Sequence, residues 1–188
     1  MPFRLLGVVP DLENLEEIGG RTFRGYAANG VAVTVACASG ADPDAIRSRA
    51  ALLGIEALIL LDYRPAERDS PSLTALLEDI LRAVRPHVVV LGGDPIMIKT
   101  GRSAFEAVRA GAASAGNLPA KLYLPAAPDS AQTSTVIRAG AGSGEKRASF
   151  RRLFPSPWVT GVVERDLFAG LSPDPDELSP SAGLRLAG

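Results

Sequence analysis

Short apolar runs recur along the chain and predict strands; the first run, which Pro10 ends, is typical of a strand that is buried on both faces of a sheet. They span residues 3–9, 31–38, 57–61, 88–91 and 121–124. A further segment, at residues 133–138, alternates apolar and polar positions, which is typical of a strand at the edge of a sheet. Beyond Gly140, glycine, serine and proline interrupt the pattern every few residues, so the strand prediction ends there.

The segments between these runs carry the signals of helices. At residues 70–85, six apolar side chains recur with the spacing of one buried helical stripe: Leu73, Leu76, Leu77, Ile80, Leu81 and Val84. Asp42 precedes Pro43 and predicts the N-cap of another helix, which ends at Gly54. Helices are also predicted at residues 15–28 and 100–115, each followed by glycine and asparagine.

Strands that alternate with helices predict an α/β fold of the Rossmann-like type, a mostly parallel sheet flanked by helices on both faces. The whole chain, residues 1–188, is interpreted as a single domain. In such sheets, ligands bind at the carboxyl ends of the strands, close to the point where the strand order reverses. A site is therefore expected among the turns at residues 10–14, 39–42, 62–69 and 92–97.

Composition limits the classes of function. The chain has 188 residues, 46% of them hydrophobic, which is enough for one domain with a core. Its 20 basic and 21 acidic side chains leave a net charge of −1 and no reason to expect nucleic acid or an anionic membrane as a partner. The apolar runs are also too short to span a bilayer. A single cysteine excludes an internal disulfide and fits a reducing cytoplasm, and the frequent alanine, glycine, proline and arginine are typical of a bacterial sequence.

Five segments in series carry a resemblance to a known family. They are RLLGVVPDLENL with the GRT at residues 20–22, LLGIEALILLDY, RAVRPHVVVLGG, DPIMIKTGRSAFEAV and LPAKLYL. Over about residues 3–125 they resemble, in order and spacing, the LmbE/PIG-L family of zinc-dependent N-deacetylases, whose first strand ends in an A-H-P-D-D-E turn. The resemblance implies a Rossmann-like fold, a zinc site built from the turns after the first and fourth strands, and removal of the N-acetyl group from an amino sugar.

The residues at the family's zinc positions depart from the family pattern. In a gapless register, Asp11 and Met97 stand where two zinc-binding histidines are expected, and Asn14 replaces a ligating aspartate. Catalytic zinc typically has three protein ligands, chiefly imidazole nitrogen and carboxylate oxygen. One carboxylate, one amide oxygen and one soft thioether do not match that set, so no zinc is expected.

The other site positions of the family are partly retained. Glu13 stands at the position of the general base, and Asp94 replaces a histidine that polarises the substrate carbonyl. A substrate-binding arginine of the family falls near Asp42 here. A second register, aligned on Pro10, would instead place Asp11 at the base position and apolar residues at two of the metal positions.

Two interpretations of the acidic turn remain open. Four oxygen-bearing side chains are available to a hard cation such as Mg²⁺ or Ca²⁺: Asp11, Glu13, Asn14 and Asp94. Alternatively, the turn caps the following helix, since carboxylates near a helix N-terminus interact favourably with its dipole. We favour capping, because acidic caps are far commoner than metal sites, and we expect no cofactor.

Four other features are interpreted structurally. His87, the only histidine, is predicted to be a partly exposed residue at the start of a strand, because no partner for a base or ligand is implied. Cys37 is predicted to be a buried, unreactive thiol, and Gly92-Gly93-Asp94 a tight loop. The basic cluster at residues 146–152 is predicted to be a short helix with a solvated face.

The function that we favour from the sequence is that of a non-catalytic relative of the deacetylases, which binds a sugar-like molecule or a protein partner. Its ligand pocket would be formed by Asp11, Asn14, Asp42 and Met97.

Two functions of other classes remain open. One is a hydrolase with an oxygen-ligated metal, in which Glu13 is the base and Asp94 the acid. The other is an assembly protein, able to form oligomers, that uses the proline-rich segment at residues 154–158 as a contact surface.

Overall fold

The computed structural model describes residues 3–19, 22–28, 30–39, 41–112, 121–125, 135–139 and 146–154. The strands in these ranges are β1 (Arg4–Val9), β2 (Ala32–Cys37), β3 (Ala57–Leu60), β4 (Val88–Leu91), β5 (Lys121–Pro125), β6 (Thr135–Ala139) and β7 (Lys146–Phe154). The helices are α1 (Leu12–Gly19), α2 (Thr22–Ala28), α3 (Pro43–Leu52), α4 (Pro71–Val84) and α5 (Pro95–Ala112), with a short 3-10 helix, η1 (Pro65–Glu67), between β3 and α4.

The strands form one sheet in the order β3-β2-β1-β4-β5-β7-β6. The first five are parallel, with β1 between β2 and β4, whereas β7 runs antiparallel to both β5 and β6. The chain moves outward from β1 to β3 and then returns to β4, so the strand order reverses between β1 and β4. The predicted α/β fold with a mostly parallel sheet is confirmed, and the predicted edge strand is β6.

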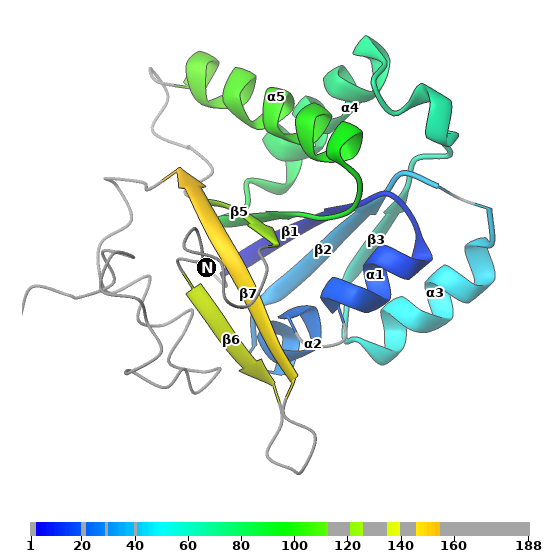
Figure 1. The fold of residues 1–188 in the computed structure, drawn as a ribbon, viewed down its shortest axis with the longest axis vertical. Helices are drawn as coiled ribbons and strands as arrows, with labels where there is room; N and C mark the ends of the chain where they lie inside the picture. The colour runs from blue at the N-terminus through cyan, green and yellow to red at the C-terminus, as the bar shows by residue number, and fades with distance from the viewer. Residues whose placement is uncertain are drawn as a thin grey trace, which may run out of the picture.

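Helices cover both faces of the parallel part of the sheet. Helices α1, α2 and α3 lie on one face, and α4 and α5 lie on the other (Figure 1). Side chains of β1 alternate between the two layers: Leu5 and Val9 belong to the first core cluster, and Leu6 and Val8 to the second. Because both faces are covered, the central strands β1 and β4 are apolar on both faces, apart from Arg4 at the start of β1.

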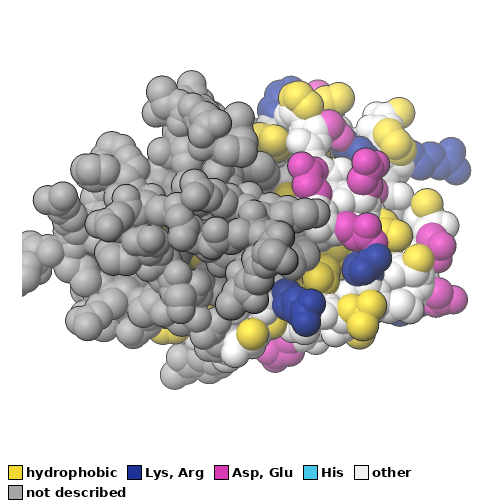
Figure 2. Space-filling model, turned by 60° about the horizontal axis from the view of Figure 1, so that its bottom comes forward, with side chains coloured by type: hydrophobic (Ala, Val, Ile, Leu, Met, Phe, Trp, Pro, Cys, Tyr) yellow, Lys and Arg dark blue, Asp and Glu magenta, His cyan; other side chains and the backbone are white. Residues whose placement is uncertain are grey.

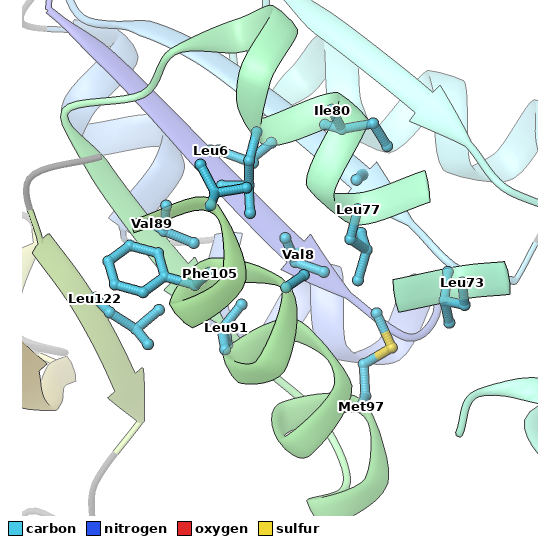
Figure 3. Close-up of a cluster of buried hydrophobic side chains, with 14 of the residues drawn as sticks. Leu6, Val8, Leu73, Leu77, Ile80, Val89, Leu91, Met97, Phe105 and Leu122 are labelled. Atoms are coloured by element: carbon cyan, nitrogen blue, oxygen red, sulfur yellow. The ribbon is translucent and has the colours of Figure 1, made fainter. Parts of the chain in front are cut away.

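The predicted helical stripe of α4 forms much of the second cluster. Leu73, Leu77, Ile80 and Leu81 are buried in it, together with Phe105 of α5. Figure 3 shows these helices packing on side chains of β1, β4 and β5, among them Leu6, Val8, Val89, Leu91 and Leu122. The stripe prediction is confirmed, and Ser70 caps the helix by accepting a hydrogen bond from the Leu73 N–H at 3.3 Å.

Two of the helix predictions are wrong in extent. The predicted helix at residues 15–28 is two helices, α1 and α2, and α1 begins at Leu12, directly after Asp11. The predicted helix at residues 100–115 begins at Pro95, directly after Asp94. In both cases an aspartate caps the helix earlier than the apolar periodicity indicates.

The predicted short helix at residues 146–152 is wrong in type. This segment lies in β7, which pairs along its length with β5 and β6. Ladder hydrogen bonds to two neighbouring strands decide its conformation, and they depend on residues distant in sequence. The proline-rich segment begins at Phe154, the last residue of β7, and its residues 155–158 lie outside the described part of the chain.

None of the helices in the described ranges has the length and apolar character needed to cross a membrane. Figure 2 shows acidic, basic and apolar side chains interspersed over the described part of one face, which matches the near balance of 20 basic and 21 acidic residues.

Candidate functional site

Two turns lie at the carboxyl edge of the sheet, where the strand order reverses. The turn after β1 contains Asp11, and the turn after β4 contains Asp94. The Gly92 N–H donates to the carbonyl oxygen of Val8 at 2.9 Å and holds the end of β4 to the end of β1. Parallel pairing thus brings together two carboxylates that are 83 positions apart, Asp11 and Asp94.

Asp11 caps helix α1. Its Oδ1 accepts hydrogen bonds from the backbone N–H of Asn14 at 3.1 Å and from Asn14 Nδ2 at 2.8 Å. These bonds satisfy a backbone N–H at the start of the helix, and the carboxylate interacts favourably with the helix dipole. The turn therefore acts as a cap, and the side-chain amide of Asn14 donates to Asp11.

Asp94 caps helix α5 and is paired with an arginine. Its Oδ1 accepts the Met97 N–H at 2.8 Å, and its Oδ2 accepts a hydrogen bond from Arg68 Nη1 at 2.7 Å. Burial acts to raise the pKa of the Asp94 carboxyl group, but these hydrogen bonds and the positive charge of Arg68 outweigh it and lower the pKa below its ordinary value. Asp94 is therefore ionised at neutral pH.

Arg68 lies between the two aspartates, and the sequence interpretation missed it. Its Nη1 pairs with Asp94, and its Nη2 lies 3.5 Å from Asp11 Oδ2 and donates to the carbonyl oxygen of Pro10 at 3.3 Å. The Arg68 side chain is 8% exposed, against 36% for Asp11 and 38% for Asp94. The guanidinium is thus the inner member of the cluster Asp11–Arg68–Asp94, here called the ion triad.

Helix α5 holds Arg68 in place. The backbone carbonyl of Arg68 accepts a 2.7 Å hydrogen bond from the buried Thr100 Oγ1. The neighbouring Asp69 pairs with Lys99 Nζ at 3.0 Å. The turn at residues 62–69 was among those where a site was expected, but its sequence contains two arginines, Arg64 and Arg68, and no local pattern distinguishes the buried one.

Three other residues predicted for the site have different surroundings. The Met97 side chain is buried in the second core cluster, 1% exposed, and only its backbone N–H contacts Asp94. Glu13 is exposed in the first turn of α1. Asp42 is exposed and is the N-cap of α3, as predicted, with Oδ1 accepting the Ala45 N–H at 3.0 Å.

Cys37 and His87 have the surroundings predicted for them. Cys37 is buried, its Sγ lies 3.3 Å from the Ser39 carbonyl oxygen, and burial raises the pKa of the thiol to about 11. The thiol is therefore protonated and unreactive at neutral pH. His87 is partly exposed at the start of β4, where its Nδ1 accepts the Arg4 N–H at 3.1 Å and its ring packs edge-on against Phe3.

The donors present at this edge do not fit a zinc ion. Each carboxylate oxygen of Asp11 and Asp94 already faces an N–H donor or the guanidinium. The amide nitrogen of Asn14 faces Asp11, and the Met97 thioether lies in the core. In the part of the chain that the structure describes, no group of three or more His, Cys, Asp or Glu residues is placed to hold a metal ion. Among the described residues, this edge therefore does not present the three nitrogen or oxygen ligands that catalytic zinc requires.

The strand order and the helices on both faces define an α/β protein with the fold of the LmbE/PIG-L-like deacetylases. Among solved structures, the chain is similar to N,N'-diacetylchitobiose deacetylase from Pyrococcus horikoshii, with a TM-score of 0.53 and 20% identity over 71% of this chain and 63% of that chain. It is also similar to the conserved protein TT1542 from Thermus thermophilus, with a TM-score of 0.58 and 19% identity over 72% of this chain and 71% of that chain.

A third similar structure is that of GalB, the 4-carboxy-2-hydroxymuconate hydratase from Pseudomonas putida, with a TM-score of 0.57 and 15% identity over 81% of this chain and 97% of that chain. No family model matches the chain, and no curated protein matches it. At these identities the likeness establishes the fold and leaves the activity to be argued from the site.

Proposed function

We propose that this protein is a non-catalytic relative of the N-deacetylases that binds a small sugar-like molecule, or a protein partner, at the carboxyl edge of its sheet. The observation that supports the proposal is the position of Arg68 between Asp11 and Asp94. A guanidinium has only N–H donors and keeps its charge, so it neither coordinates a metal nor accepts a proton. Arg68 forms ion pairs with Asp11 and Asp94, the two carboxylates closest to the point where the strand order reverses.

The zinc-dependent reaction of the N-deacetylases requires groups that the described residues at the carboxyl edge of the sheet do not supply. Deacetylation by zinc depends on a bound water whose pKa is lowered by the metal. With Asp11 and Asp94 engaged by helix N–H groups and by Arg68, no step of that reaction can be assigned to them. Glu13 is exposed in the first turn of α1, whereas a general base must lie within hydrogen-bond reach of the proton that it abstracts.

The fold does not decide between activities. The similar solved structures include a deacetylase and a hydratase, which carry out different reactions on one architecture. The edge of the sheet where the strand order reverses is, however, the usual place for a ligand in folds of this kind. Ligand binding without catalysis is therefore the function that this edge supports best.

The proposal is tested by measuring binding and turnover on the same protein. N-acetylglucosamine and N,N'-diacetylchitobiose are titrated in a calorimeter, and release of free amine from both is followed with and without added Zn²⁺. We expect saturable binding of at least one sugar, weakened by Asp11→Asn, with amine release equal to the buffer rate. Asp79→Asn, on the exposed face of α4, is the matched control and leaves binding unchanged.

Turnover would contradict this proposal. Amine release above the buffer rate that is abolished by Glu13→Gln would assign the chain to the metal-dependent hydrolases instead. If neither sugar binds and sedimentation shows concentration-dependent assembly, the small-molecule part of the proposal is wrong and the protein-partner part is supported.

A further inference from the structure

The ion triad joins three elements that are distant in sequence. Asp11 follows β1, Arg68 follows η1, and Asp94 follows β4, so the arginine is 57 positions from one aspartate and 26 from the other. Its two Nη atoms point to different carboxylates, at 2.7 Å and 3.5 Å. Such a forked arrangement is specific to arginine, because the planar guanidinium presents its donors in fixed directions.

The charges of the triad explain why an inner cation is needed. Two helix-capping aspartates at adjacent turns bring two negative charges close together, and like charges at short range repel. The Arg68 side chain lies deeper than either aspartate and contributes one positive charge. In a metal-dependent relative, a bound cation would compensate the negative charge of carboxylates at such an edge. In this protein, the positive charge of the Arg68 side chain compensates them instead.

We propose that Arg68 is a built-in cation that takes the place of a metal ion between Asp11 and Asp94 and holds the turns after β1 and β4 together. This proposal rests on the proposed function, in which the site has no metal chemistry, and it deepens that function by naming the group that replaces the metal. The folded protein consequently needs no divalent cation, and its stability depends on Arg68 rather than on a metal supply.

The geometry of the backbone supports this role. Two backbone carbonyl oxygens around the triad also accept hydrogen bonds. The carbonyl oxygen of Pro10 accepts one from Arg68 Nη2, and the carbonyl oxygen of Arg68 accepts one from Thr100 Oγ1. The arginine thus bridges the turn after β1 and the capping residue of α5, while its own backbone is anchored to α5. Removing its charge leaves two aspartates uncompensated at adjacent turns, and removing one partner of a partly buried ion pair in this way is destabilising.

The first test compares two arginines that each contact two carboxylates. Arg82 pairs with Glu78 and Asp79, as Arg68 pairs with Asp11 and Asp94, but Arg82 is 54% exposed. Thermal unfolding is followed for Arg68→Met and Arg82→Met, since methionine keeps an apolar stem without the charge. We expect the Tm of Arg68→Met to fall by about 8 °C and that of Arg82→Met to change by less than about 2 °C. Equal effects would overturn the proposal.

A second pair of variants keeps the proposal testable if Arg68→Met does not fold. Asp94 and Asp42 both cap helices, and asparagine caps as well as aspartate does. The loss of charge is therefore the main change in Asp94→Asn and Asp42→Asn. We expect the Tm to fall by about 5 °C in Asp94→Asn only, because only Asp94 is paired with Arg68. An unchanged Tm in Asp94→Asn would refute the role of the ion pair.

The third test concerns the metal directly and uses no sugar. Chelator-stripped protein is titrated with Zn²⁺, Mg²⁺, Mn²⁺ and Ca²⁺ by calorimetry. We expect no saturable one-to-one binding at this edge and a Tm that is the same with chelator and with added metal. One-to-one binding that Asp11→Asn abolishes would show that a metal displaces Arg68, and would overturn the inference. A failure of sugar binding alone would affect the proposed function and leave these three results unchanged.

Discussion

Gly93 allows the turn after β4 to lie against the turn after β1. Its φ angle is +102°, a region that residues with a side chain rarely adopt, and a Cβ atom built on it would lie 2.3 Å from Pro10 Cγ. Because Asp94 is the next residue, this close approach also places the Asp94 carboxylate within reach of Arg68. The predicted tight loop at residues 92–94 is confirmed in this form.

We predict that Gly93→Ala destabilises the protein by about 2 kcal/mol, since it adds both backbone strain and overlap with Pro10. The measurement is urea unfolding. The matched control is Gly111→Ala in α5, where a Cβ would have nothing within 4 Å. Alanine there is expected to be neutral or to stabilise by about 0.5 kcal/mol. A Gly93→Ala protein as stable as the wild type would show that the two turns need not touch.

At the scale of elements, α4 is the helix whose burial the apolar pattern describes best. Leu73 and Leu77 are 0% and 1% exposed, and both lie in the second core cluster against β1 (Figure 3). The helix also precedes β4 in the chain, so its packing sets where β4 and the Asp94 turn return to the sheet. A defect in this layer is therefore expected to affect the whole domain.

We predict that Leu77→Ala lowers the free energy of unfolding by about 3 kcal/mol, because it removes buried methyl groups and leaves a cavity. Leu52→Ala is the control, since Leu52 is a helical leucine that is 70% exposed, and it should cost less than about 0.5 kcal/mol. Urea unfolding measures both, and an unchanged m-value would indicate that the unfolded state is the same. Similar losses in the two variants would contradict the burial seen here.

On the scale of the whole molecule, β4 carries a titratable group at each end. His87 stands directly before its first residue, and Asp94 lies in the turn after its last residue. Burial of the ring, together with the charge of Arg4, lowers the pKa of His87 below its ordinary value of 6.5. Protonation would also remove the acceptor that Nδ1 offers to the Arg4 N–H.

The direction of the pH effect follows from proton binding. Between the lowered pKa of folded His87 and 6.5, the unfolded chain holds more protons than the folded chain, so stability rises with pH across this window. Asp94, whose pKa is lowered from 3.8, contributes stability that is present above 3.8 and is lost as the pH falls through its folded pKa. The two contributions thus fade in separate ranges as the solution is acidified.

We predict that the Tm of the wild type falls as the pH is lowered through 6.5, and that His87→Asn flattens this part of the profile. The asparagine side-chain oxygen provides an acceptor for the Arg4 N–H and does not titrate. The measurement is thermal unfolding at a series of pH values in buffers of equal ionic strength. A variant profile parallel to that of the wild type would exclude His87 as the source of the slope.

Much of the secondary structure of this protein can be predicted from the local pattern of apolar and capping residues. The apolar runs that became β1, β2, β3, β4 and β5, the stripe of α4 and the Asp42 cap of α3 were all predicted, because burial and capping leave a period or a residue type at adjacent positions. Strand β3 is nevertheless only partly buried, because it lies at the edge of the sheet. Helix starts were predicted less well: Asp11 and Asp94 begin α1 and α5 earlier than the apolar residues indicate. Strand β7 was mistaken for a helix, since its pairing partners decide its conformation.

The sequence by itself determined the class of fold, the order of its elements and the carboxylates at two of its turns. Only the tertiary structure decided that Arg68, and not Arg64, enters the space between Asp11 and Asp94, and that the Met97 thioether belongs to the core. The physical reason is the distance along the sequence over which each feature is set. Apolar periodicity records which neighbouring positions are buried. The pairing of charges that follow β1, η1 and β4 depends instead on how the sheet brings the ends of these distant elements together.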